Sequence, residues 1–161
     1  MATPALDRLV RVEFGDSRDL DDVMTVMRAA FGDRYGEAWT RSQCAGILPM
    51  SGVVMRIARD AEGGGAIGFS LVRSIAGESE LLLLAVLPGW HREGIGTRLL
   101  DDFIDRARLD GLARVHLEVR DGNPAVAMYR AAGFVPVGRR RNYYRGLDGL
   151  RFDALTYARE L

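Results

Sequence analysis

The chain has 161 residues, 48% of them hydrophobic and 27% charged, and its 22 basic residues, all of them arginines, balance 22 acidic ones. This composition is typical of a globular protein with a sizeable core, so we expect a single domain over residues 1–161. A formal net charge of zero gives no reason to expect nucleic acid or a membrane as a partner. A lone cysteine, Cys44, excludes an internal disulfide, and the absence of a signal peptide or long apolar run predicts a cytoplasmic protein.

The N-terminal part predicts one strand followed by two helices. Residues 9–14 alternate between apolar and polar, as a half-buried strand does. Asp16 or Ser17 can cap a helix over residues 19–31, whose apolar side chains recur at helical spacing. After a Gly-rich break, a second short helix is expected from Thr40 or Ser42 to about Leu48.

The rest of the chain predicts six further strands and two helices. The helices are expected from Ile95 to the Gly111 cap and over about residues 124–132. The order β-α-α-β-β-β-α-β-α-β-β describes an α/β fold with a mixed, mostly antiparallel central sheet of six or seven strands and helices on both faces. The six strands are expected at residues 53–59, 66–75, 81–87, 113–120, 134–139 and about 152–159.

The stretch LLLLAVLPGWHREGIGTRLL, residues 81–100, organises this pattern. Its continuous apolar run favours a central strand buried on both faces, and a Gly-rich turn then opens a helix. Glycines let a ligand approach the exposed amides at a helix N-terminus, where the dipole favours an anion. A Walker loop is excluded because the chain has no lysine, and a Rossmann fingerprint needs a third glycine where Leu99 stands. A tight strand-to-helix connection uses the same residues and remains an alternative.

The strand ARVHLEVR places four titratable side chains on one face, Arg114, His116, Glu118 and Arg120. Either this face opens into a cleft or it is a solvated face with cross-strand ion pairs. Acyl transfer from a thioester to an amine needs a base, a donor for the developing oxyanion and an acid for the thiolate. Glu118 suits the base, and the phenol of Tyr129 on the following helix suits the acid. Main-chain amides of Leu84, Ala85 and Val86 suit the donor if their strand splays from its neighbour.

Two segments carry a resemblance to a known family. The turn at His91 to Gly96 resembles the acyl-CoA-binding motif of the GNAT superfamily of N-acetyltransferases, Gln/Arg-x-x-Gly-x-Gly/Ala, with histidine at the first position. LEVRDGNPAVAMYRAAGF at residues 117–134, followed by RRNYY at residues 140–144, resembles the RimI-type ribosomal-protein alanine N-acetyltransferases. The resemblance covers about half of the chain, and it implies the GNAT fold and acetyl-CoA as cosubstrate.

The same resemblance implies roles for individual residues. Glu118 takes the family's general-base position and Tyr129 its general-acid position. Asn123 stands one residue closer to Tyr129 than the family pattern has it, and Phe152 replaces a usual acidic residue. The implied acetyl-CoA contacts are His91, Arg92, Glu93, Gly94, Ile95, Gly96, Thr97 and Asn123, with Leu84, Ala85 and Val86 near the acetyl group.

In this family the region between the first two helices helps to wall the acceptor site. Tyr35, Trp39 and Met50 are candidates for that wall, and closing the core is the favoured alternative for all three. Of these, Tyr35 and Trp39 are the candidate substrate-binding residues. Tyr143 and Tyr144 would point to opposite faces of an extended strand, so we expect only Tyr144 to face the acceptor. The basic run of residues 139–141 is expected to be a solvated strand end rather than a phosphate clamp.

The sequence therefore predicts an acetyl-CoA-dependent N-acetyltransferase that works by direct attack in a ternary complex. The expected acceptor is the α-amino group of a protein N-terminus, such as that of a ribosomal protein. A small amine acceptor and a non-catalytic acyl-CoA-binding module are the alternatives. No metal is expected, because the two histidines and one cysteine lack ligand spacing.

Overall fold

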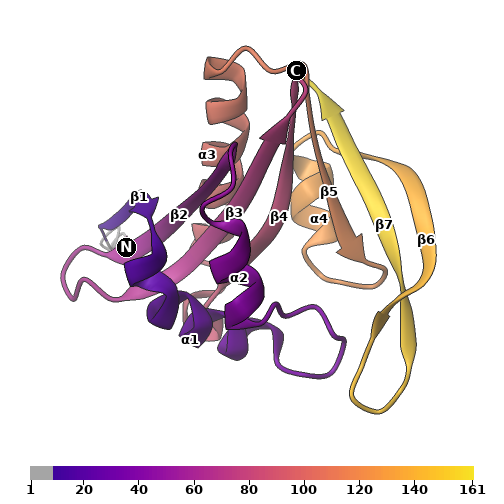
Figure 1. The fold of residues 1–161 in the computed structure, drawn as a ribbon, viewed down its shortest axis with the longest axis horizontal. Helices are drawn as coiled ribbons and strands as arrows, with labels where there is room; N and C mark the ends of the chain where they lie inside the picture. Colours follow the sequence, from indigo (N-terminus) through magenta and orange to yellow (C-terminus); the bar gives the residue numbers. More distant parts are fainter. Residues whose placement is uncertain (1–8) are drawn as a thin grey trace, which may run out of the picture.

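A computed structural model describes residues 9–161, so the first eight residues of the predicted domain lie outside the described part. Seven strands form one sheet in the order β1-β2-β3-β4-β5-β7-β6 (Figure 1). Every neighbouring pair is antiparallel except β4 and β5, which are parallel. The fold class and the element order predicted from the sequence are confirmed. The strands are β1 (Val10–Gly15), β2 (Val53–Asp60), β3 (Ala66–Ile75), β4 (Glu78–Val86), β5 (Arg114–Arg120), β6 (Val135–Arg145) and β7 (Arg151–Glu160).

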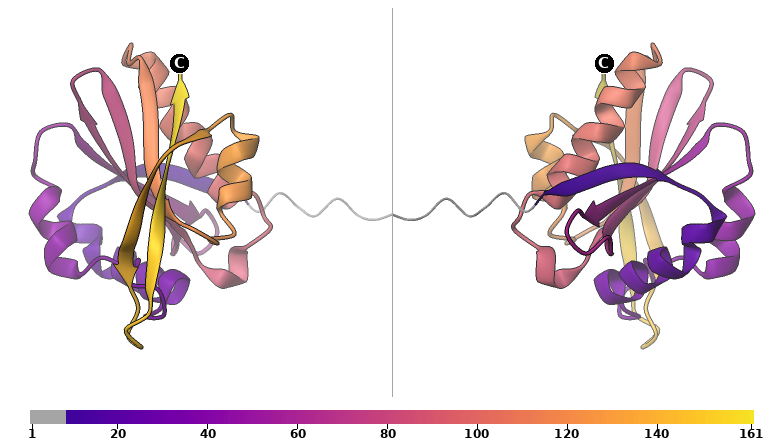
Figure 2. Two further views of the ribbon diagram at one scale, coloured as in Figure 1. Left: turned by 90° about the vertical axis from the view of Figure 1, so that its right-hand side faces the viewer. Right: turned by 90° about the vertical axis from the view of Figure 1, so that its left-hand side faces the viewer.

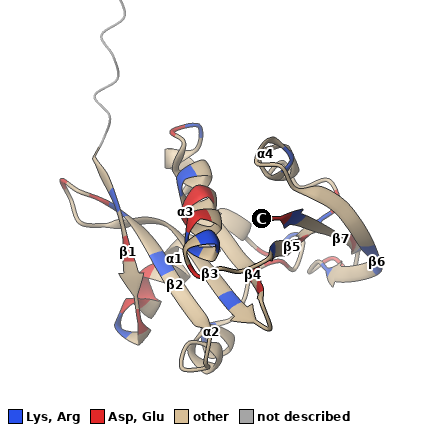
Figure 3. Cartoon of the chain, turned by 90° about the horizontal axis from the view of Figure 1, so that it is seen from above, with Lys and Arg blue, Asp and Glu red and all other residues tan. Residues whose placement is uncertain are grey.

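The helices cover both faces of the sheet. Helices α1 (Leu20–Phe31) and α2 (Arg41–Ile47) lie on one face, and α3 (Ile95–Leu109) and α4 (Val126–Ala131) lie on the other (Figure 2). Thr40 begins α2 with a capping box, in which its hydroxyl accepts from the Gln43 N–H at 3.1 Å. Charged residues occur along α3 as blue and red bands (Figure 3), and Arg98, Asp101, Asp105 and Arg108 among them are exposed. No helix within residues 9–161 is long and apolar enough to cross a membrane.

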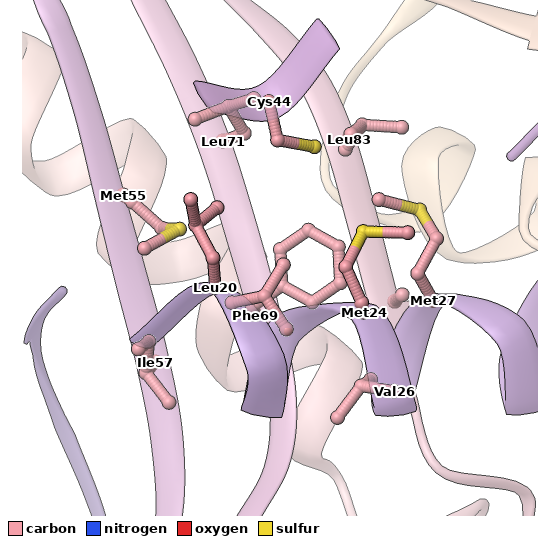
Figure 4. Close-up of a cluster of buried hydrophobic side chains, with 12 residues drawn as sticks. Leu20, Met24, Val26, Met27, Cys44, Met55, Ile57, Phe69, Leu71 and Leu83 are labelled. Carbon is pink, nitrogen blue, oxygen red and sulfur yellow. The ribbon is translucent and has the colours of Figure 1, made fainter. Parts of the chain in front are cut away.

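A cluster of buried side chains joins α1 and α2 to strands β2, β3 and β4 (Figure 4). Met27 and Phe69 lie at its centre and are almost completely removed from solvent. Cys44, the lone cysteine, is buried in this cluster too. Two further clusters bury the inner face of α3 against the opposite side of the sheet. The sheet is therefore fixed from both sides by apolar burial, the dominant favourable term in folding.

Strand β4 contains a β-bulge at Leu82. Leu71 pairs with Leu83 and Val72 with Leu81, which leaves Leu82 as the extra residue. The bulge changes the face of the sheet to which the following side chains of β4 point. Leu81, before the bulge, packs with the α3 cluster, whereas Leu83, after it, packs with the α1 cluster. The predicted complete burial of this run is wrong, since buried and half-buried residues alternate along β4. The strand also begins at Glu78 rather than at residue 81.

The parallel pairing of β4 with β5 is short. It runs only from Glu78–Leu81 on β4 to Arg114–Leu117 on β5 and stops at the bulge. Beyond that point β4 stays paired with β3, and β5 stays paired with β7 as far as Arg120. The two halves of the sheet therefore part at the middle of β4, as the ribbon shows (Figure 1).

Strand β6 extends to Arg145, well past the predicted end at residue 139. A second bulge interrupts its pairing with β7, where Arg140 faces Ala154 and the next paired residue is Tyr144. Within this bulge Asn142 has φ +55°, and its N–H donates to the Asp153 carboxylate at 2.9 Å. The run RRRNYYR lacks the alternation of a half-buried strand, so the sequence pattern did not indicate its extended backbone.

Candidate active site

A cleft of about 920 Å³ opens where β4 and β5 part. Its walls come from β4, the turn before α3, the end of β5, α4, the α1–α2 connection and β6. Its volume is typical of a site for a cofactor-sized molecule. Every residue predicted for the site lines this cleft except the exposed Glu93: Tyr35, Trp39, Leu84, Ala85, Val86, His91, Arg92, Gly94, Ile95, Gly96, Thr97, Glu118, Asn123, Tyr129 and Tyr144.

One end of the cleft is the N-terminus of α3. Gly94 precedes the helix with φ +76°, in the left-handed region that disfavours other residues, and no side chain caps the helix. The first bond of the helix is donated by the Arg98 N–H to the Gly94 carbonyl at 2.9 Å. The preceding N–H groups of residues 95–97 therefore have no acceptor within the helix. Uncapped amides at the positive end of a 15-residue helix are suited to an anion.

Close packing fixes this turn beside the cleft. A Cβ on Gly96 would lie 3.2 Å from the Met128 sulfur, so glycine lets α3 approach α4. The Ile95 side chain is buried in the core, which leaves its backbone to the cleft. The His91 ring nitrogen Nε2 lies 3.1 Å from the Val86 carbonyl and ties the turn to the end of β4.

Glu118 and Tyr129 face the same cleft from β5 and α4. The Glu118 side chain is 21% exposed, and its Oε1 lies 2.9 Å from Nε of Arg140, whose side chain is 62% exposed. Tyr129 is buried, and its ring packs edge-on against Phe134. Burial, with a smaller contribution from the nearby Glu37 carboxylate, raises the pKa of Tyr129 to about 12. The phenol therefore keeps its proton throughout the neutral range.

The sequence left open whether the polar face of β5 forms cross-strand ion pairs or opens into a cleft. The structure shows that one half of this face does each. Near the start of the strand, Arg114 forms an ion pair with Glu78 at 3.5 Å, and Nε2 of His116 lies 3.6 Å from the Glu78 carboxylate. At the other end, Glu118 and Arg120 line the cleft. The division follows the strand pairing, because β4 covers only the first half of β5.

The opposite end of the cleft is aromatic. Tyr35, Trp39, Tyr143 and Tyr144 line it, whereas Met50 is exposed and lies outside it. Trp39 also packs against the α1 cluster, so the predicted core role holds for Trp39 in part and is wrong for Met50. Burial and the Glu118 and Glu37 carboxylates raise the pKa of the Tyr144 hydroxyl.

Both tyrosines of the RRNYY segment reach the cleft. The rings of Tyr143 and Tyr144 meet edge to face with centroids 5.1 Å apart. The prediction that they point to opposite sides is wrong, because the bulge at Asn142 interrupts the regular alternation of the strand. The basic run of residues 139–141 is exposed to solvent, as expected, and Arg139 also forms ion pairs with Asp121 at 3.0 Å and Asp153 at 2.6 Å.

Besides Glu80 of β4, sequence reasoning missed the cleft carboxylate of Glu37, which lies in the α1–α2 connection. Its side chain is 11% exposed and forms an ion pair with Arg120, 83 residues further along the chain. No local pattern marks such a residue, because its partners are brought to it only by the fold. Within residues 9–161 no three His, Cys, Asp or Glu side chains are grouped so as to hold a metal ion.

Similarity in sequence to relatives extends over about three fifths of this chain, and two of these relatives illustrate it. The ribosomal protein bS18-alanine N-acetyltransferase of Escherichia coli K12 is 38% identical over 98 residues, which cover 60% of this chain and 66% of the relative. The N-alpha-acetyltransferase RimI of Mycobacterium tuberculosis is 43% identical over 103 residues, 61% of each chain. The matched segment thus spans less than two thirds of each relative's own length.

Similarity of the fold extends over nearly the whole chain. The crystal structure of the ribosomal-protein-S18-alanine N-acetyltransferase from Escherichia coli superposes with a TM-score of 0.84 at 27% identity, covering 94% of both chains. The model of the acetyltransferase (GNAT) family matches residues 20–134, which contain the parted strands, the glycine turn and Tyr129. The chain therefore belongs to the acetyltransferase (GNAT) family.

Proposed function

We propose that this protein is an acetyl-CoA-dependent N-acetyltransferase whose acceptor is the α-amino group of a protein N-terminus. The observation that carries the proposal is the cleft between β4 and β5, with an anion-binding turn at one end and Glu118 and Tyr129 facing its interior. The two relatives, named as a ribosomal protein bS18-alanine N-acetyltransferase and as an N-alpha-acetyltransferase, support this acceptor class.

The residues of the cleft fit acetyl-CoA. The uncapped N–H groups of residues 95–97 suit a pyrophosphate, and Gly94 supplies the left-handed backbone that aims them. Half-buried apolar side chains of β4 suit the pantetheine arm. Asn123 is held in a fixed orientation, because Nδ2 donates to Glu37 at 2.9 Å and Oδ1 accepts from the Ala125 N–H at 2.9 Å. Each of these atoms keeps one further hydrogen-bonding position, so the side chain can still contact the cosubstrate.

The cosubstrate supplies an activated acetyl thioester, and the chain's own groups manage the protons. Glu118 accepts a proton from the acceptor amine, whose nitrogen then attacks the carbonyl carbon. Backbone N–H groups of β4 beyond Leu81, where β5 no longer pairs, donate to the carbonyl oxygen as it gains charge. As the carbon–sulfur bond breaks, Tyr129 donates its phenolic proton to the thiolate. The second proton that the nitrogen loses as the amide forms restores the phenol.

The placement of the cysteine supports direct transfer by arguing against an acyl-cysteine intermediate. Cys44 is buried in the α1 cluster and does not line the cleft. Burial also raises the pKa of its thiol, which disfavours the nucleophilic thiolate.

The proposal is tested by incubating the protein with acetyl-CoA and a panel of N-terminal peptides, followed by mass spectrometry. We expect acetylation at the α-amine of peptides with a small first residue, and none when that amine is blocked. Free polyamines, amino acids and lysine side chains serve as competing acceptors. Preferential acetylation of a small amine, or binding of acetyl-CoA with no turnover on any acceptor, would contradict the proposal.

A further inference from the structure

Glu37 connects three segments around the acceptor end of the cleft. Its Oε1 accepts from Nε of Arg120 at 3.0 Å, and its Oε2 accepts from Nδ2 of Asn123 at 2.9 Å. The side chains of Glu37 and Arg120 are only 11% and 8% exposed. Arg120 ends β5, two residues after Glu118, and Asn123 lies in the turn that leads to α4. One buried carboxylate thus joins the α1–α2 connection to the strand that carries Glu118 and to the turn before the helix that carries Tyr129.

The same connection is fastened by aromatic and backbone contacts. The Arg120 guanidinium carbon lies 3.6 Å from the centroid of the Tyr35 ring, and that ring meets Phe152 edge-on with centroids 5.0 Å apart. Gly36 lies directly against the Arg145 carbonyl, with no room for a side chain. The α1–α2 connection therefore rests against the hairpin of β6 and β7, which carries Tyr143 and Tyr144.

Asn123 links Glu37 to the start of α4 through its two hydrogen bonds. Because its Oδ1 accepts from the Ala125 N–H, the turn of residues 121–125 is held just before the helix that bears Tyr129. Without the Glu37 carboxylate, Arg120 would be a buried charge with no acidic partner, a strongly unfavourable arrangement. Arg120 and Asn123 would then have to move or take up water.

We propose that Glu37 is a positioning residue for acceptor binding, holding the α1–α2 connection, the end of β5 and the turn before α4 in one arrangement. This inference rests on the proposed function. Glu37 does not exchange a proton with substrate; it orients the groups that do. Misplacement of reacting groups by about 1 Å costs on the order of 100-fold in rate, so loss of this carboxylate should affect acceptor use far more than acetyl-CoA binding.

The test compares Glu37→Gln with a matched control, Asp102→Asn. Asp102 on α3 accepts two hydrogen bonds from Arg56, at 3.1 and 3.0 Å, and their side chains are 18% and 13% exposed. It lies outside the cleft. For Glu37→Gln we expect kcat/KM for the acceptor peptide to fall about 10- to 100-fold, with the acetyl-CoA Kd within about twofold. Asp102→Asn should lower Tm comparably and leave kcat/KM unchanged; equal kinetics in the two variants would overturn the proposal.

A double variant separates positioning from stability. Glu37→Met with Arg120→Met removes both buried charges, so we expect Tm to recover toward the wild-type value. Acceptor kcat/KM should stay low, because the contacts that hold the connection are still absent. Recovery of kcat/KM together with Tm would show that Glu37 matters only for folding.

Hydrogen exchange provides a readout that does not depend on turnover. In Glu37→Gln, amides of residues 32–40 and 121–125 should exchange faster together, while those of α3 keep their wild-type rates. Unchanged exchange in both segments would contradict the inference. If the wild-type protein acetylates no peptide, the proposed function fails, and the exchange data still decide whether Glu37 holds these segments.

Discussion

Replacing Glu118 by glutamine removes the proposed base and leaves the shape of the side chain nearly unchanged. A positioned general base contributes about 10²- to 10⁴-fold to a rate. At about 1.4 kcal/mol for each factor of ten, this corresponds to a loss of ~3 to 5 kcal/mol of transition-state stabilisation. We therefore expect kcat for Glu118→Gln to fall by 10²- to 10⁴-fold.

The effect on stability should be much smaller. The partner of Glu118 is Arg140, whose side chain is 62% exposed and belongs to the β6 bulge at the mouth of the cleft. Ion pairs with such a solvent-exposed partner contribute only about 0.2–1 kcal/mol. For a domain of this size that is a shift of a few degrees in Tm, at most about 4 °C. The loss of rate would thus greatly exceed the loss of folded protein.

The assay measures single-turnover rates at saturating acetyl-CoA, with Tm and acetyl-CoA Kd determined on the same samples. Glu78→Gln is the matched control, because Glu78 also pairs with basic residues of β5 but lies outside the cleft. It should keep the wild-type rate. If Glu118→Gln also kept the wild-type rate, the assignment of Glu118 as the base would be wrong.

Three further predictions follow from the same geometry. Gly94→Val should abolish measurable acetyl-CoA binding in calorimetry, because it adds a branched side chain at φ +76° beside the uncapped amides of α3. The circular dichroism spectrum of this variant should remain native. Normal binding would show that the turn is misassigned. Tyr129→Phe should lower kcat. In the wild-type protein the rate should show no alkaline loss from this phenol below about pH 10, because its raised pKa of about 12 keeps it protonated. Linkage also requires the free energy of unfolding to fall as pH rises from 10 toward 12, and Tyr129→Phe should make that fall smaller. Met27→Ala should lower the free energy of unfolding by about 2–5 kcal/mol in urea titrations, and a change below about 1 kcal/mol would contradict the packing described for α1.

Local patterns account well for the elements that frame the site. Apolar residues at helical spacing placed α1 and α3, and Thr40, one of the two expected starts, is the N-cap of α2. The glycine turn was found because left-handed backbone and close approach favour glycine locally, as Gly94 and Gly96 illustrate. The sequence prediction ended strand β6 too early, because the bulge at Asn142 disrupts the alternation on which strand prediction depends.

The sequence by itself determined the order of the elements and the position of the glycine turn, since each follows from residues close together in the chain. It also marked Glu118 and Tyr129, which the structure places in the same cleft. Tertiary structure alone decided where β4 leaves β5, because the bulge at Leu82 is defined only by pairing with β3. It also decided that Glu37 meets Arg120 and that both Tyr143 and Tyr144 reach the cleft. These contacts join residues far apart in the sequence, and the energies that select them arise only once the sheet has formed.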